Sequence, residues 1–86
     1  MTYADRMREK LTEAFAPEVL EIIDESEAHR GHGGYQEGGE THFKVVIKAA
    51  AFNGMSRVAQ QRAVMAAVKA ELDERVHALA LEVSGA

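Results

Sequence analysis

The chain has 86 residues, 47% of them hydrophobic and 28% charged, with a formal net charge of −4 and no cysteine. This length suits one small domain over residues 1–86, and the composition is that of a globular protein. The missing cysteines exclude disulfides, a thiol nucleophile and any thiolate metal site built by this chain alone. No apolar stretch could span a bilayer, and charge begins too early for a signal peptide. We therefore expect a cytoplasmic protein with no membrane partner.

The first elements are a helix and a strand. Apolar residues recur at helical spacing from Thr2 to Phe15, and Thr2 with Asp5 forms a capping-box pattern at the start. The residues of the apolar face are Tyr3, Met7, Leu11, Ala14 and Phe15. Pro17, the only proline, ends the helix. The short β-branched run Val19–Ile23 predicts a strand.

A glycine-rich loop, at about residues 29–40, precedes the second predicted strand. Five of the seven glycines lie there, too dense for regular structure. Thr41–Lys48 then alternates as a strand does. Phe43, Val45 and Ile47 should face the core, and the opposite parity should face solvent. That opposite parity includes His42, Lys44 and Lys48.

The remaining elements are helical and then extended. Phe52-Asn53-Gly54 predicts a turn, and Ser56 can cap a helix that reaches about Glu74. The apolar arc of that helix consists of Val64, Met65, Val68 and Leu72. A straight helix would place Arg57 and Gln61 inside this arc, so we expect a bend or a short separate helix before Arg62.

The last apolar run, Val76–Val83, predicts a third strand. The expected fold is α+β, in the order α-β-β-α-(α)-β. A three-stranded sheet with helices on one face would bury one parity of each strand and leave the other open.

No enzyme motif is present. The four histidines show no His-x3-His pair, and without cysteine they do not predict a closed zinc site. Gly31-His32-Gly33-Gly34 lacks the lysine and hydroxyl residue of a phosphate loop. We therefore expect a protein that is not an enzyme.

His77 is the histidine that most needs an explanation, since it begins an otherwise apolar strand. It could be a hydrogen-bonded structural residue or a ligand at a strand end, and spacing alone favours the structural role. If the glycine-rich loop folds over the end of the sheet, His29 or His32 could approach His77. Two imidazoles on one iron, with thiolates from a second protein on the other, is workable 2Fe-2S chemistry. Such binding would weaken in acid, because the ligating nitrogen must be unprotonated.

Charge is unevenly distributed along the chain. Residues 41–70 hold five basic residues and no acidic one, whereas the rest holds 14 acids against five bases. Such a split can make a basic face that binds nucleic acid, or it can be ordinary solvated surface. The candidate nucleic-acid-binding residues are Lys44, Lys48, Arg57 and Arg62.

Several segments, taken together and in order, resemble the BolA family. They are Asp24-Glu25-Ser26, Glu40-Thr41-His42-Phe43-Lys44-Val45-Val46, Phe52-Asn53-Gly54 and Val76-His77-Ala78-Leu79-Ala80-Leu81. The match runs from about Met7 to Leu81. The family's α-β-β-α-α-β topology, related to class II KH domains, agrees with the order expected above.

The resemblance implies a function. BolA-like proteins pair with monothiol glutaredoxins and share a 2Fe-2S cluster with them, in cluster trafficking or in iron and redox regulation. The glutaredoxin cysteine and glutathione supply the thiolates. The resemblance implies His77 as one ligand and His29 as the loop ligand, with His32 as the alternative. The parity of His42, which it shares with Lys44 and Lys48, instead predicts a structural or surface residue. We expect the isolated chain to bind no cluster and to be a monomer or weak dimer.

The same resemblance supports a second function, since some BolA-like proteins are described as transcriptional regulators. DNA would then be a partner, bound by a KH-like surface. Near the place of the KH Gly-x-x-Gly loop the chain has Gly54-Met55-Ser56-Arg57, which lacks the second glycine. Where the family commonly shows Arg-His-Arg the chain has Gln60-Gln61-Arg62, so only Arg62 corresponds.

Overall fold

A computed structural model describes residues 2–25 and 41–86 of the chain. The elements are α1 (Tyr3–Phe15), β1 (Val19–Asp24), β2 (His42–Lys48), the 3-10 turn η2 (Ala50–Phe52), α2 (Arg57–Ala67), α3 (Lys69–Glu74) and β3 (Ala78–Ser84). This α+β order confirms the predicted topology. In the described part of the chain, no helix is long and apolar enough to cross a membrane.

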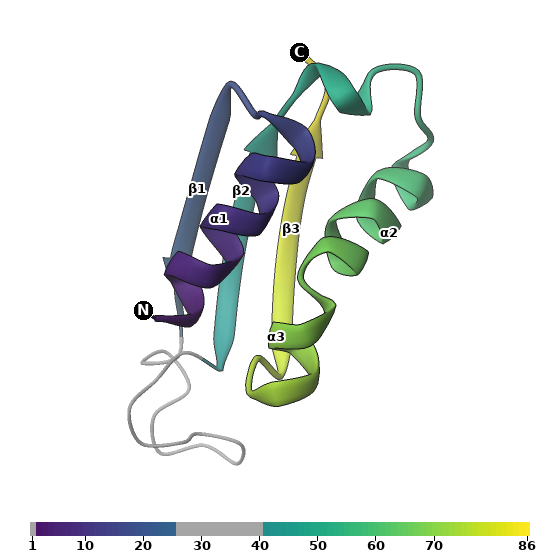
Figure 1. Cartoon of the computed structure of the whole chain (residues 1–86). Coiled ribbons are helices and arrows are strands. Elements are labelled where there is room, and N and C mark those ends of the chain that lie inside the picture. The colour runs from purple at the N-terminus through teal and green to yellow at the C-terminus, as the bar shows by residue number, and fades with distance from the viewer. Residues whose placement is uncertain (1, 26–40) are drawn as a thin grey trace.

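The sheet is mixed, in the order β1-β2-β3. β2 is antiparallel to β1 and parallel to β3. The helices pack on one face of this sheet (Figure 1). On β2 the predicted parity holds: Phe43, Val45 and Ile47 are buried, while the opposite parity is half-buried or exposed.

The first helix begins and ends as its sequence predicts. Thr2 Oγ1 accepts a hydrogen bond from the Asp5 N–H, and the Asp5 carboxylate accepts one from the Thr2 N–H. These bonds satisfy N–H groups that lack partners inside a first helical turn. They also hold the pKa of Asp5 below its ordinary value. At the other end Ala16 has a positive φ of 45°, and Pro17 prevents further helix.

The second helical region is broken, but not where the sequence predicted. Ser56 caps α2 as expected, by accepting a hydrogen bond from the Ala59 N–H. The break is a single residue, Val68, between α2 and α3. The prediction of a break before Arg62 is therefore wrong. Val68 is fully buried, so the change of direction keeps both helices against the core.

Candidate functional site at the end of the sheet

His77 lies directly before β3 and is exposed. Its backbone N–H donates to the Thr41 carbonyl at 2.7 Å, and the next N–H, that of Ala78, donates to the same oxygen at 3.2 Å. Thr41 is fully buried. One buried residue therefore fixes the backbone of His77 and leaves its ring at the surface.

The same end of the sheet holds both borders of the glycine-rich segment. The described chain stops after Glu25 and resumes at Thr41, and the Glu25 N–H donates to the His42 carbonyl at 2.7 Å. His42 pairs in register with Ala78, so the Thr41 border lies beside the start of β3, whereas the Glu25 border lies one strand further away, at the end of β1 (Figure 1). His29 and His32 lie outside the described residues, and their approach to His77 stays a prediction.

His42 is the second imidazole at this end. It is half-buried on the parity opposite the core, and its Nδ1 is hydrogen-bonded to Thr41 Oγ1 at 2.9 Å. In residues 2–25 and 41–86, no group of three or more His, Cys, Asp or Glu side chains could hold a metal ion. At this end of the sheet, the imidazoles that the described residues present are thus His77, which is exposed, and His42, which is half-buried.

The segment that leads into His77 is anchored by α3. The Glu71 carbonyl accepts hydrogen bonds from the N–H groups of Arg75, at 3.1 Å, and Val76, at 3.0 Å. Val76 itself is almost fully buried, with 1% of its surface exposed. The end of α3 and a core side chain thus fix the chain one residue before His77.

A buried carboxylate, that of Glu71, joins α3 to α1, and sequence patterns did not predict it. The Glu71 side chain is fully buried, and its oxygens accept from Lys10 Nζ at 2.8 and 2.9 Å. Arg6 Nη2 lies 2.9 Å from the same carboxylate. Because both cations come from one face of α1, Glu71 is compensated despite its burial. These partners are separated by 61 or more residues, so no local pattern could have predicted the pairing.

Arg6 extends the contact to the surface. Its two guanidinium nitrogens donate to the Glu74 carboxylate at 2.7 and 3.1 Å, in a bidentate pair. The hydrogen bond from Arg6 holds the pKa of Glu74 below its ordinary value, and the same bond raises the pKa of Arg6. The guanidinium also lies 4.7 Å from the centre of the Tyr3 ring. We call Tyr3, Arg6, Lys10, Glu71 and Glu74 the α1–α3 charge cluster.

The predicted nucleic-acid-binding residues are divided between two layers. Lys44 and Lys48 belong to the parity of β2 that faces away from the core, and Lys44 pairs with Glu82 at 3.3 Å. Arg57 and Arg62 are exposed on α2, in the helical layer. The residues are thus not gathered into one basic patch.

The connection between the two helices does not lie where the KH-like loop was expected. Gly54, whose φ is 77°, precedes α2, whereas the connection between the two helices is Val68. The comparison of Gly54-Met55-Ser56-Arg57 with a loop between the helices is therefore wrong. The actual connection, Ala67-Val68-Lys69-Ala70, contains no glycine at all.

Fold and site together define a small α+β protein with an exposed histidine at a strand start, at the same end of the sheet as both borders of a glycine-rich segment. Comparison with known proteins gives this class a name. The family model described as "BolA-like protein" matches residues 11–85. The chain belongs to the BolA family.

Its relatives include proteins of different lengths. An uncharacterized protein of a Sinorhizobium species is 49% identical over 83 residues, covering 95% of this chain and 89% of the relative. Human BolA-like protein 1 is 43% identical over 76 residues, covering 88% of this chain and 53% of the human protein. The chain thus spans about half the length of that relative.

Two further comparisons concern function and fold. A protein of Escherichia coli K12 named DNA-binding transcriptional regulator BolA is 40% identical over 81 residues, covering 94% of this chain and 73% of the relative. The structure of BolA1 from Arabidopsis thaliana superposes with a TM-score of 0.88 at 36% identity, covering 99% of this chain and 93% of the other. The likeness therefore extends over the whole fold.

Proposed function

We propose that this protein is a non-enzymatic adaptor that pairs with a monothiol glutaredoxin and shares a 2Fe-2S cluster with it. The observation that carries the proposal is the position of His77. Its ring is exposed, and its backbone is fixed to Thr41, the residue at which the described chain resumes after the segment that holds His29 and His32. Family membership supports the same function.

In this proposal the chain supplies imidazole and the partner supplies thiolate. His77 is one ligand, and His29 or His32 is the second. The cluster would carry iron and sulfide between proteins, and this chain's part is to present nitrogen ligands at a fixed place. Because acid protonates the ligating nitrogens, cluster sharing should weaken as the pH falls. A chain without cysteine depends on its partner for the remaining ligands.

The test is a spectral titration. The protein is mixed with a monothiol glutaredoxin, glutathione, iron and sulfide, and visible absorption and circular dichroism are compared with those of the glutaredoxin alone. We expect a changed spectrum that reverts to the glutaredoxin spectrum with His77→Ala. His42→Gln is the matched control, because His42 lies at the same end but engages Thr41. His29→Ala and His32→Ala then identify the loop ligand.

Two results would contradict the proposal. One is a spectrum that does not change when the protein is added. The other is a changed spectrum that is indifferent to His77→Ala, with far-UV circular dichroism showing that the variant is folded.

A second candidate function is DNA binding, which the name of the Escherichia coli relative favours. Separated basic residues and a net charge of −4 oppose strong contact with a phosphate backbone. A salt titration of binding to duplex DNA distinguishes the two functions. Affinity at physiological salt that falls when Lys44, Lys48 and Arg62 are neutralised would favour the regulator.

A further inference from the structure

β3 is one of the two outer strands of the described sheet, and its core-facing residues are incompletely covered. Val45 and Ile47 on β2 are fully buried. Their register partners on β3, Leu81 and Val83, are only half-buried. Both pairs face the same helical layer, so the greater exposure of Leu81 and Val83 arises at the unpaired side of β3. The apolar side chains of the last strand are therefore left partly uncovered.

The backbone of β3 has hydrogen-bonding groups on that side with which no described strand pairs. The Ala78 N–H and the Ser84 carbonyl both bond toward β2, to Thr41 and Ala49 respectively. Since successive residues of a strand point their N–H and C=O groups to alternate sides, those of Leu79, Leu81 and Val83 point away from β2. Among the described residues no strand pairs with them. An edge of this kind can accept another strand.

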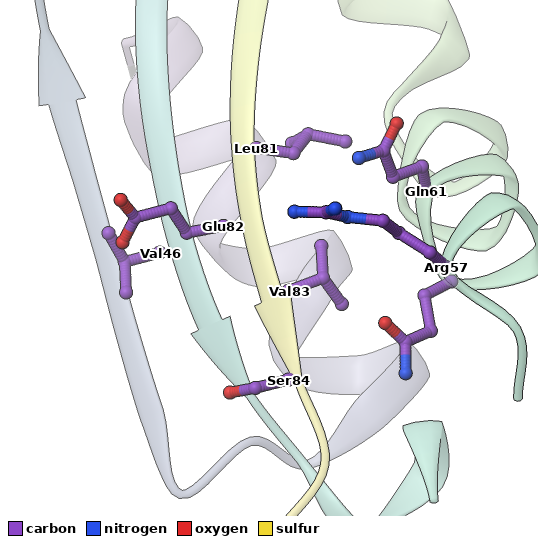
Figure 2. A pocket seen from close by; sticks show the side chains of 8 residues that line it. Val46, Arg57, Gln61, Leu81, Glu82, Val83 and Ser84 are labelled. Carbon is purple, nitrogen blue, oxygen red and sulfur yellow. The ribbon is translucent and has the colours of Figure 1, made fainter. Parts of the chain in front are cut away.

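A groove of about 400 Å³ runs between this edge and α2. Figure 2 shows Arg57 and Gln61 reaching from α2 toward β3, with Leu81 and Val83 directed at them. Arg57 makes no ion pair with any residue in the described ranges. Glu82 points to the other face of the sheet, where it pairs with Lys44. On the helical side of β3 the groove therefore places two aliphatic side chains, Leu81 and Val83, opposite Arg57, a cation without an ion-pair partner among the described residues. The remaining lining is mostly polar and includes Glu82 at the other face.

We infer that this groove binds an extended segment of a partner protein, which adds to β3 as a fourth strand. Main-chain bonds to Leu79, Leu81 and Val83 would supply general affinity, as in other cases of strand addition. An aliphatic side chain of the segment would cover Leu81 and Val83. A carboxylate beside it would pair with Arg57. The occupant is thus an extended acidic and aliphatic segment.

A second copy of this chain does not suit the groove. Antiparallel pairing of two β3 strands in one continuous sheet requires a two-fold axis perpendicular to that sheet. Such an axis keeps the helices of both copies on the same face. The two α2 helices, each packed beside β3 (Figure 1), would then lie on the same face of the joined sheet and compete for the space above the shared edge.

The site is independent of the proposed cluster ligands. The groove involves residues 81–84 of β3, whereas His77 precedes the start of that strand. Peptide binding can thus succeed or fail whatever the spectral titration shows.

The test uses a panel of capped eight-residue peptides in which valine alternates with threonine and one glutamate is moved along the sequence. Binding is followed by amide chemical shifts of the ¹⁵N-labelled full chain. We expect shifts at Leu79, Leu81 and Val83 and at the Arg57 side chain. Replacing the glutamate by glutamine should weaken binding about two- to fivefold, as for a partly exposed ion pair. Arg57→Gln should abolish that preference, and Arg62→Gln, the matched control, should keep it.

Three outcomes would overturn the inference. The first is no binding by any peptide of the panel at millimolar concentration. The second is unchanged binding by peptides N-methylated at the residues that face β3, since methylation removes the strand-pairing N–H groups. The third is a single-stranded oligothymidine that shifts the same amides at lower concentration than every peptide, which would make the groove a nucleic-acid site.

Discussion

The α1–α3 charge cluster and the groove between α2 and β3 lie against the same sheet, but their charged residues differ in whether they are paired. In the cluster, two cations of α1 meet a fully buried carboxylate, and Arg6 also pairs with Glu74. In the groove, Arg57 faces β3 with no carboxylate partner among the described residues. The first arrangement fastens the segment before His77. The second leaves charge available to a partner. The contrast separates residues that should support stability from residues that should support binding.

The largest expected effect is at Glu71. We expect Glu71→Gln to lower the free energy of unfolding by about 2–3 kcal/mol, because it weakens charge-assisted hydrogen bonds at a buried position while leaving two cations that are only partly buried. Urea denaturation measures the change. Asp73→Asn is the control, since it removes the exposed Lys69–Asp73 pair of the same helix. That variant should cost about 0.3–0.5 kcal/mol. Equal losses in the two variants would contradict the role assigned to burial.

A smaller effect is expected at the start of α1, the helix that carries both cations. Thr2→Ala removes the side-chain acceptor for the Asp5 N–H. We expect a loss of about 1 kcal/mol in the free energy of unfolding. Thr2→Ser, which keeps the hydroxyl, should retain most of the stability that Thr2→Ala loses. Thermal or urea unfolding of both variants provides the measurement, and identical losses would show that the cap is unimportant.

Acid should weaken the cluster further. Glu74 has an ordinary pKa of 4.5, which Arg6 lowers in the folded protein. A lowered folded-state pKa means that the contribution of Glu74 is complete above about pH 4.5 and disappears as the pH falls through the folded value. The wild type should therefore lose more stability between pH 6 and pH 3 than Glu74→Gln does. A pH series of urea midpoints tests this, and parallel curves would refute it.

The smallest effect on stability is expected in the groove. Arg57→Gln should change the free energy of unfolding by less than about 0.5 kcal/mol, because the side chain is exposed and unpaired by any described carboxylate. The measurement is urea denaturation beside Glu71→Gln. A loss comparable to that of Glu71→Gln would erase the distinction between the two regions.

Local patterns predicted most of the fold. The Thr2 and Asp5 capping box, the alternation of Phe43, Val45 and Ile47, and the cap at Ser56 each depend on neighbours in sequence, and each is confirmed. The position of the helix break was not predictable in this way. Arg57 and Gln61 do not need a break to avoid the core, because α2 presents them to the groove at the edge of the sheet.

The candidate site was predicted in part. His77 is exposed at the strand start, as its sequence position indicated, whereas its ligand role and those of His29 and His32 remain predictions. The burial of Glu71 could not be predicted from sequence, because nothing local distinguishes it from the other acidic residues of α3. Only the packing of α1 against α3 distinguishes it from Asp73 and Glu74.

The parallel pairing of β2 and β3 has a consequence for where a ligand can be assembled. Parallel strands begin at the same end of the sheet. Thr41, which follows the glycine-rich segment, therefore lies beside His77, which precedes β3. An antiparallel β3 of the same seven residues would carry its first residue about 20 Å away, at the far end of the sheet. Parallel pairing requires the long crossover through α2 and α3. That crossover lets two histidine-bearing segments, remote in sequence, begin their strands side by side.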